Sequence, residues 1–588
     1  MARMTRRGFL GALAAAQAQT RARPNIVLIL TDDQGWWDIA AHGNRFVRTP
    51  HMDRLAAEGV SFERFYVCPV CAPTRAELMT GRYYLRTGVY NTRFGGDTLD
   101  ARETTLPQVL QRAGYRTGIF GKWHLGRYAA QHPIHRGFDE TLIFTQGHTE
   151  RYFYPDQLEH NRKPIAARGY VTDVLTDAAI QFVKQSGGRP FFLYLPYNAP
   201  HSPNYVPSRY TERYMKMGVP IGDAEIYGMV ERVDENIGRL LEVLDKEGLR
   251  GNTIVLFLSD NGGVSRHYRA HLRGAKASVF EGGVRAPLFV RWPGRLRPGT
   301  KVEPMVKVFD IFPTLCDLLG IPLPEGLALD GKSVRALLET GLGSSPHPFL
   351  CHYWDRFRPG KTQGWSICEP RFKLVGEQLF DLANDPSEKS DVSRQYPEDK
   401  RRLRARFDAW FDDVTQGKTF EPPAIEVGRH DENPVDLEPS WARLNGTHTT
   451  WASPGDEETT PASPLPGRHA PSTVNYTFAG YEWDSIDSWR TPGETVHWNI
   501  DVVRAGRYEV TLSYGCDPAD AGGRFRIRAG SASIETVVHP TAGRALFEKH
   551  VCGVLRLAKG PAKLEVAALE VKGKELMALN RIWLRSLS

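Results

Sequence analysis

The chain has 588 residues, of which 41% are hydrophobic and 24% are charged, a composition typical of globular proteins rather than of disordered or fibrous ones. The formal charge of +7 is small for this length and gives no indication of a nucleic-acid partner. Because single cores stop growing beyond about 300 residues, we expect two domains, one of them large.

The first residues resemble an export signal. The segment Thr5 to Leu10 contains paired arginines and precedes a short apolar run, and Ala16-Gln17-Ala18 has the form of a cleavage site. The apolar run is far shorter than the roughly 20 residues that cross a bilayer, so no stable membrane insertion is expected. We assign 1–22 to a twin-arginine-like signal and predict export to the periplasm or the extracellular space.

Four apolar runs of strand length each end in polar side chains. The first, Asn25 to Leu30, is continuous, as in a strand buried on both faces. The polar residues at or just beyond the ends of the four runs are Asp32 with Asp33, Lys122 with His124, His201, and Asp260 with Asn261. With helical spacing between the runs, this pattern predicts an α/β fold, in which ligands bind at the carboxyl edge of the sheet.

The cysteine pattern marks a further candidate site. Cys71-Ala72-Pro73-Thr74-Arg75 is followed by Thr80-Gly81-Arg82, and Cys68 lies three residues before Cys71. A C-x-x-C pair is also found in redox and zinc sites. The seven cysteines contain no second pair at similar spacing, which argues against zinc, whereas a redox pair and a structural thiol pair stay open.

The Cys-x-Pro-x-Arg core with its Thr-Gly-Arg ending resembles the signature of type I, formylglycine-dependent sulfatases. The resemblance covers roughly Arg23 to Gln416. It implies an alkaline-phosphatase-like α/β core, with a large mixed sheet flanked by helices, as a catalytic domain over 23–420. It further implies that a formylglycine-generating enzyme converts Cys71 to formylglycine, whose hydrated aldehyde is the nucleophile. Glu77 stands where a small or apolar residue is usual, and the sequence gives it no role.

The resemblance also implies roles for the polar residues. The implied metal ligands are Asp32, Asp33, Cys71, Asp260 and Asn261, and the implied catalytic residues are Cys71, Arg75, Lys122, His124, His201 and Lys276. The oxygen ligands suit Ca²⁺, with Mg²⁺ as the alternative. Arg75 is implied to neutralise the hydrated aldehyde, and Lys122 with His124 to bind and deprotonate its second hydroxyl. His201 and Lys276 are implied to bind sulfate and assist the leaving alcohol.

The chain changes character near residue 421. From 421 to 471 it is rich in Pro, Gly, Ser, Thr and acidic residues without periodicity, which predicts a linker. From 472 to 588, short alternating runs between glycine turn signals predict an all-β sandwich of the jelly-roll type. Its resemblance to carbohydrate-binding jelly rolls makes Tyr481, Trp483 and Trp489 candidates for a sugar-stacking platform, with the core of the sandwich as the other interpretation.

These features predict an exported sulfatase that hydrolyses sulfate monoesters of a sulfated small molecule or glycan, most simply a carbohydrate. The enzymatic alternative is a phosphonate monoester or phosphodiester hydrolase of the same superfamily. The alternative from another class is a catalytically silent glycan-binding protein in which Cys71 is unmodified. Loops such as His148 to Asp156 and Arg266 to Arg273 are expected to build the pocket walls, so the sequence leaves the sugar unnamed.

Overall fold

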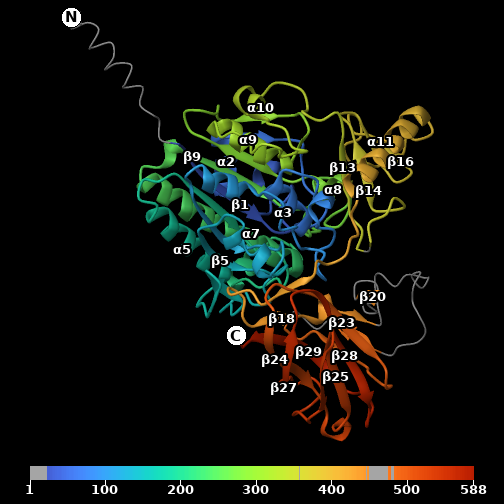
Figure 1. Cartoon of the computed structure of the whole chain (residues 1–588). Helices are drawn as coiled ribbons and strands as arrows, with labels where there is room; N and C mark the ends of the chain where they lie inside the picture. The colour runs from blue at the N-terminus through green and yellow to red at the C-terminus, as the bar shows by residue number, and fades with distance from the viewer. Residues whose placement is uncertain (1–22, 357, 445–446, 449–473, 478–481, 588) are drawn as a thin grey trace, which may run out of the picture.

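The computed structural model describes residues 23–356, 358–444, 447–448, 474–477 and 482–587. The predicted export signal lies outside the described residues, as does 449–473 of the predicted linker. Within the described ranges, no helix is both long and apolar enough to cross a bilayer. Figure 1 shows an α/β region at the top and an all-β region, coloured orange to red, beneath it.

The α/β region is built on a ten-stranded sheet with β1 (Asn25–Thr31) near its middle. β1 pairs in parallel with β8 (Phe191–Pro196) and β9 (Thr253–Ser259), and β8 pairs in parallel with β4 (Arg116–Lys122). The carboxyl ends of these four strands therefore meet at one edge. The outer strands are β10 (Leu288–Arg291), β2 (Val60–Phe62) and β11 (Thr300–Val302) beyond β9, and β5 (Glu140–Phe144), β6 (Leu158–His160) and β7 (Lys163–Ile165) beyond β4.

Antiparallel pairing of β10 with β9 and of β6 with β5 makes the sheet mixed, as expected from the sequence. Helices cover both of its faces, because alternate residues of β1 enter two separate cores. One core contains side chains of α3 (Cys71–Thr80), α4 (Leu106–Arg112), α8 (Glu281–Val284), α9 (Ile311–Leu319), α10 (Arg335–Thr340) and α11 (Pro397–Thr415). The other contains side chains of α2 (Pro50–Glu58), α5 (Val171–Lys184), α6 (Ser208–Met215) and α7 (Ile221–Lys246).

A second, four-stranded antiparallel sheet closes the α/β region. Its strands, in spatial order, are β13 (Leu350–Tyr353), β14 (Trp365–Cys368), β15 (Phe372–Val375) and β16 (Gln378–Asp381). α11 packs on this sheet, where the rings of Trp365 and Phe407 stack with centroids 4.2 Å apart. β3 (Phe65–Tyr66) and β12 (Val306–Lys307) form a separate two-stranded parallel pair. In sequence, β3 precedes α3 and β12 precedes α9.

The C-terminal region is a sandwich of two sheets, as predicted. One sheet contains β17 (Ile425–Val427), β19 (Arg443–Leu444), β20 (Thr447–His448), β23 (Thr495–Val502), β25 (Arg524–Ala529), β26 (Ala532–Val537) and β28 (Gly560–Glu570). The other contains β18 (Val435–Leu437), β21 (Asn475–Thr477), β22 (Ser485–Asp487), β24 (Gly506–Gly515), β27 (Glu548–Leu557) and β29 (Ala578–Ser586). Inward side chains of both sheets form one core.

The structure differs from the predicted linker over 421–471. Ile425–Val427 pairs in parallel with β23, and Val435–Leu437 pairs with β29, so these two segments belong to the sandwich. Strands of three residues are too short to show an alternating pattern, and their partners lie far along the chain, which is why composition alone suggested a linker.

The predicted sugar-stacking platform is not formed as a unit. Trp489 is fully buried, and its indole Nε1 donates to the carbonyl of Ile486 at 3.0 Å, so it is a core residue. Trp483 is 52% exposed, with its ring centroid 6.4 Å from that of Phe547. Tyr481 lies outside the described residues.

Candidate active site

The signature motif forms the start of a fully buried helix. Cys71 is the first residue of α3, all ten residues of which are buried, and Pro73 lies within the first turn, where a proline lacks no needed N–H group. The helix ends at Gly81, whose φ of 67° is in the left-handed region. The free N–H groups and the dipole of a helix N-terminus favour negative charge at Cys71. Arg75, one turn later, lies on the same face.

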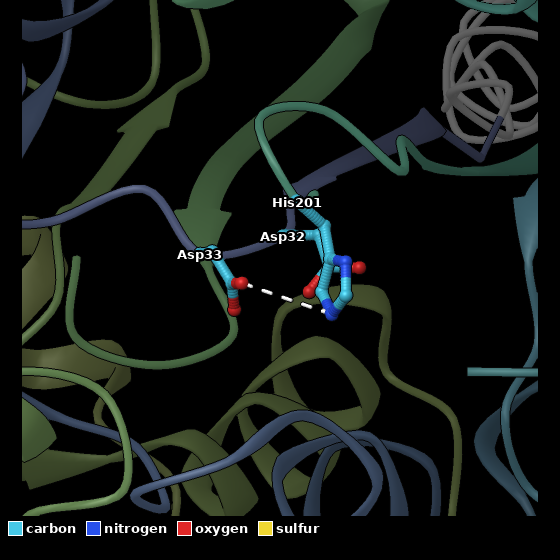
Figure 2. Close-up of side chains that lie close together, drawn as sticks. All are labelled: Asp32, Asp33 and His201. Carbon is cyan, nitrogen blue, oxygen red and sulfur yellow. Dashed lines mark ion pairs between the residues drawn. The ribbon is translucent and has the colours of Figure 1, made fainter. Parts of the chain in front are cut away.

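Two strand ends bring carboxylates to Cys71. Thr31 of β1 lies opposite Ser259 of β9, so the residues that follow each strand are adjacent. Ligand atoms of Asp32, Cys71 and Asp260 lie within 4.8 Å of one another. Ligand atoms of Asp32, Asp33 and His201 also lie within 4.8 Å of one another. Asp33 Oδ2 is 3.8 Å from His201 Nε2 (Figure 2).

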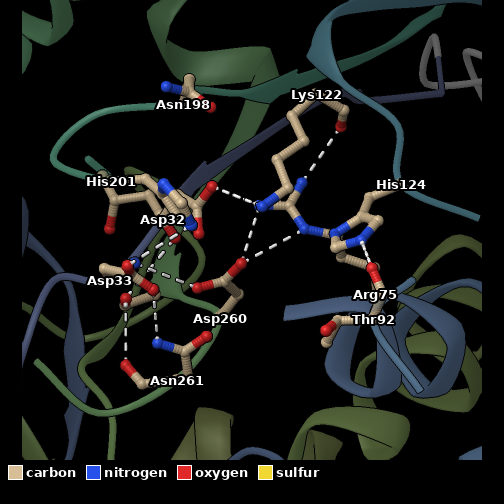
Figure 3. Close-up of polar contacts among 12 residues, drawn as sticks. Asp32, Asp33, Arg75, Thr92, Lys122, His124, Asn198, His201, Asp260 and Asn261 are labelled. Atoms are coloured by element: carbon tan, nitrogen blue, oxygen red, sulfur yellow. Dashed lines mark hydrogen bonds and ion pairs between the residues drawn. The ribbon is translucent and has the colours of Figure 1, made fainter. Parts of the chain in front are cut away.

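Three basic side chains pair with these carboxylates, and Figure 3 labels two of them, Arg75 and Lys122. Lys122 Nζ donates to Asp32 Oδ2 at 2.6 Å. Arg75 Nη2 donates to Asp260 Oδ2 at 2.7 Å. Arg75 Nη2 also lies 3.8 Å from Asp32 Oδ2. Lys276 Nζ donates to Asp33 Oδ2 at 2.7 Å.

The guanidinium of Arg75 is also held in place by backbone. Its Nη1 donates to the carbonyl of Lys122 at 3.0 Å, which ties the signature helix to the end of β4. Arg75 and Lys122 have no exposed side-chain surface. These contacts join six of the predicted site residues at one edge of the sheet: Asp32, Asp33, Arg75, Lys122, Asp260 and Lys276.

The acidic cluster fits a hard divalent cation. Burial and the nearby carboxylate of Asp260 raise the pKa of Asp32 well above its ordinary value. Asp32 Oδ1 and Asn261 Oδ1 are both buried without a hydrogen-bond partner among the described residues. Asn261 donates its Nδ2 to Asp33 Oδ1 at 2.9 Å, which leaves its oxygen as an available ligand. Buried carboxylate and amide oxygens without partners are the ligand set that Ca²⁺ or Mg²⁺ takes.

Lys276 sets the charge of Asp33. Burial alone would raise the pKa of Asp33, but Lys276 and then His201 outweigh it and lower the pKa well below its usual range. The pKa of Lys276 is raised in turn, because the attraction of Asp33 and Cys71 exceeds the opposing effect of burial. Asp33 is thus ionised and Lys276 charged at neutral pH.

Both predicted histidines are held neutral. Burial, with the nearby charge of Lys122, lowers the pKa of His124 to about 3. Burial, with the nearby charge of Lys276, lowers the pKa of His201 well below its usual 6.5. A neutral imidazole can accept a proton, so each ring is suited to act as a base. His124 Nε2 lies 2.8 Å from the carbonyl oxygen of Thr92.

The sequence indicated His148 only as the first residue of a pocket loop, and the structure places it beside His201. Its ring stacks on that of His201, with centroids 5.2 Å apart and an angle of 11° between the ring planes. Burial, followed by the charges of Lys122 and Arg93, lowers its pKa to about 3. His148 follows β5, a fifth strand that also delivers polar residues to this edge, and that repetition of the pattern was the available signal.

Glu77 is fully buried and lies two residues after Arg75, so the two side chains do not share a face of the helix. Glu77 Oε1 is 3.2 Å from Nζ of Lys307, which is itself buried and donates to the carbonyl of Cys351 at 3.0 Å. The unexpected residue of the signature therefore anchors α3 to the end of β12 and to β13.

The sulfatase family model matches residues 24–321, and the model described as N-sulphoglucosamine sulphohydrolase, C-terminal, matches 274–410. The chain belongs to the sulfatase family. N-acetylgalactosamine-6-sulfatase of Mus musculus is 34% identical over 518 residues, which cover 76% of this chain and 93% of the mouse protein. The uncharacterized sulfatase YdeN of Escherichia coli is 34% identical over 63% of this chain and 75% of its own.

Solved structures share the fold of the α/β region. Ps i-CgsB, determined with and without k-i-k-neocarrahexaose, superposes with a TM-score of 0.62 at 32% identity, covering 67% of this chain and 94% of its own. Phosphonate monoester hydrolase of Agrobacterium radiobacter superposes with a TM-score of 0.52 at 24% identity over 67% of this chain and 95% of its own, which shows a shared fold. This sulfatase is thus a sulfuric ester hydrolase with an alkaline-phosphatase-like core.

Proposed function

We propose that this sulfatase removes sulfate from carbohydrate esters by means of a formylglycine derived from Cys71. The observation that carries the proposal is the position of Cys71, at a buried helix N-terminus with its Sγ within 4.8 Å of the ligand oxygens of Asp32 and Asp260. A formylglycine-generating enzyme is the partner that this conversion requires.

The charges of Arg75 and Lys276 interact directly with Cys71, while Lys122 pairs with Asp32 and His201 lies beside Asp33. A sulfate monoester is anionic and repels a nucleophile, so its hydrolysis needs positive charge around the sulfuryl oxygens. Lys276 and His201 lie on the Asp33 side, where both bind the sulfate and the charged Lys276 donates a proton to the departing alcohol. Arg75 and Lys122 lie on the side of Asp260 and Asp32, where they stabilise the oxygens of the hydrated aldehyde.

The reaction then has two steps. One hydroxyl oxygen of the aldehyde hydrate forms a bond to sulfur as the bond from sulfur to the alcohol oxygen breaks, and the alcohol leaves with a proton. A base, assigned to neutral His124, removes the proton of the second hydroxyl; the C=O bond forms again and the C–O bond to sulfate breaks. Water rehydrates the aldehyde. A serine or cysteine lacks the second hydroxyl and would stay sulfated.

Asp32, Asp33, Asp260 and Asn261 would hold a divalent cation, Ca²⁺ or Mg²⁺. When bound, the ion supplies polarisation of the sulfate oxygens and of the nucleophile's hydroxyl. The buried oxygens of Asp32 and Asn261 that lack hydrogen-bond partners support this assignment.

The substrate class rests on named relatives. The mouse relative is named N-acetylgalactosamine-6-sulfatase, and Ps i-CgsB was solved with k-i-k-neocarrahexaose. We therefore assign a sulfated carbohydrate to this site, in a protein exported by its first 22 residues to the periplasm or beyond. In the proposed domain division, a catalytic domain ends near 420 and a carbohydrate-associated sandwich follows.

The proposal is tested by mass and turnover together. Conversion of the Cys71 side chain from CH₂SH to CHO lowers the mass of its peptide by about 18 Da, whereas ordinary thiol oxidation raises it. We expect that loss, together with faster hydrolysis of aryl sulfate than of aryl phosphonate. An unmodified Cys71 in active enzyme would refute the formylglycine, and a preference for the phosphonate would favour the other hydrolase of this fold.

A further inference from the structure

His124, the residue assigned above as the base, has one ring nitrogen that donates and one that is left to accept a proton. Its Nε2 lies 2.8 Å from the carbonyl oxygen of Thr92, and because a carbonyl oxygen accepts but cannot donate, Nε2 carries the proton of the neutral ring. Nδ1 is then unprotonated, and within the described ranges it is buried without a hydrogen-bond partner. Nδ1 is therefore the atom of His124 that can take a proton.

Asp97 faces the protonated nitrogen of this ring. Its Oδ2 lies 3.8 Å from His124 Nε2, and its side chain is 19% exposed. That distance is too long for a hydrogen bond to the neutral ring, whereas the attraction between two full charges extends well beyond it, most strongly away from bulk water. Burial raises the pKa of Asp97, while His124, Arg127 and Arg93 favour its ionised form. The carboxylate therefore acts on His124 chiefly after the ring has gained a proton.

Asp97 opposes the other charges that act on His124. Burial lowers the pKa of the ring, Lys122 and Arg75 lower it further, and the charge of Asp97 works in the opposite direction. The charge of Arg75 also interacts with Cys71, so the base and the proposed nucleophile share the field of one guanidinium. Protonated His124 would therefore stand among positive charges, and Asp97 supplies the negative charge that makes its protonation less costly.

Backbone contacts fix Asp97 relative to His124. The N–H group of Leu99, two residues after Asp97, donates to the carbonyl of Leu125, the residue after His124, at 3.2 Å. His124 itself has a φ of 59°, in the left-handed region that side chains disfavour, and its N–H group donates to the carbonyl of Thr145 at 3.2 Å. The surrounding structure therefore imposes the orientation of the ring, as is found where a side chain has a defined task.

We infer that Asp97 is a positioning residue for the second step of the reaction proposed above, in which it stabilises His124 while that ring holds the proton. In that step the proton moves from the second hydroxyl oxygen of the sulfated hydrate to Nδ1 of His124. The O–H electron pair forms the C=O bond, and the C–O bond breaks with its electron pair leaving on sulfate. Water then takes the proton from Nδ1. The inference rests on the function assigned to Cys71, because without formylglycine there is no second hydroxyl.

The test is an Asp97→Asn variant, which keeps the shape of the side chain and removes its charge. We expect kcat on an aryl sulfate to fall about tenfold or more and KM to fall by the same factor. The value of kcat/KM, which reports sulfuryl transfer to the hydrate, should stay within about twofold. Rapid mixing should then show a burst of aryl alcohol, near one per formylglycine, before slow turnover, because the sulfated intermediate accumulates.

Asp100→Asn is the matched control. Asp100 lies three residues after Asp97, and its carboxylate accepts from Arg102 Nη2 at 2.6 Å, so the same substitution there should leave both kcat and KM at wild-type values. Since KM does not depend on the amount of active enzyme, a lower yield of folded protein cannot imitate the fall expected for Asp97→Asn.

A double variant asks whether Asp97 acts through His124. His124→Ala removes the ring, so adding Asp97→Asn to it should change kcat by less than about twofold. The overturning results are an additive loss in the double variant, an unchanged kcat in Asp97→Asn, or a loss in kcat/KM without a burst. A wild type that carries no formylglycine, or that does not hydrolyse the aryl sulfate, would instead refute the function assigned to Cys71.

Discussion

The α/β region contains two clusters of buried charged side chains, and the clusters differ in what surrounds those side chains. The reaction cluster consists of Asp32, Asp33, Asp260, Arg75, Lys122 and Lys276. The packing cluster consists of Glu77, Lys307, Glu281, Lys373 and Glu388. Each combines three carboxylates with two or three basic side chains, so buried charge alone does not distinguish a site of chemistry from a structural one.

The partners of the cations make the distinction. In the packing cluster, Lys307 lies over the rings of Tyr83 at 4.5 Å and Phe309 at 5.3 Å, and Lys373 bridges two carboxylates at 2.9 and 3.1 Å. In the reaction cluster, the cations face carboxylates gathered around Cys71, with ligand atoms of Asp32, Cys71 and Asp260 within 4.8 Å of one another. We therefore expect substitutions in the packing cluster to change stability and substitutions in the reaction cluster to change activity.

The largest expected effect is that of Cys71→Ala. Without the nucleophile, aryl sulfate turnover should fall by about four orders of magnitude or more, while the melting temperature changes little because a thiol is replaced by a smaller apolar group. Cys68→Ala, three residues earlier and equally buried, is the matched control and should stay active. Retained turnover in the Cys71 variant would contradict the assignment.

Lys276→Ala comes next within the reaction cluster. Loss of a positive charge aimed at the sulfate should lower kcat/KM by about 10²–10³. Steady-state kinetics on aryl sulfate would measure it, with Lys301→Ala as control, since Lys301 has a side chain 71% exposed on β11. Equal kinetics for the two variants would remove Lys276 from the reaction cluster.

In the packing cluster, Lys307→Ala should leave Glu77 buried and unpaired. That costs about 3–5 kcal/mol of unfolding free energy, whereas replacing both partners by apolar residues is often neutral. Denaturant unfolding should therefore show a large loss for Lys307→Ala and recovery in a Glu77→Leu/Lys307→Met double variant. Turnover per formylglycine in the folded fraction should stay near wild type; its loss would place this pair in the reaction cluster.

The smallest expected effect is on the pH dependence of stability. Burial, with the charges of Lys307 and Lys373, lowers the pKa of His352 well below its usual 6.5, so the folded protein keeps it neutral. The unfolded chain takes up the proton below about pH 6.5, so this contribution is constant above that pH and stability falls below it by about 1.4 kcal/mol per pH unit. Other buried histidines, such as His124 and His201, add to the same slope, so His352→Gln should reduce it by about one proton's share. An unchanged slope would contradict the assignment.

Much of the reaction cluster was predictable because each of its residues follows an apolar strand or lies in a short motif, and parallel strands end at one edge. The packing cluster was not, since Glu77 and Lys307 are far apart in sequence and neither carries a local signal. The strands at Ile425–Val427 and Val435–Leu437 were missed for the same reason, because long-range pairing defines them. Trp489 and Trp483 look alike in sequence, and only the packing separates a core ring from an exposed one.

The complete burial of α3 has a consequence for the life of the protein. Cys71 is 3% exposed, and every residue of its helix is covered, so a modifying enzyme has no access to it once the domain has folded. If Cys71 is converted as proposed, conversion competes with folding for the same nascent chain. The share of active molecules is then set during synthesis, and slowing folding or raising the amount of modifying enzyme should increase specific activity without changing the rate per active molecule.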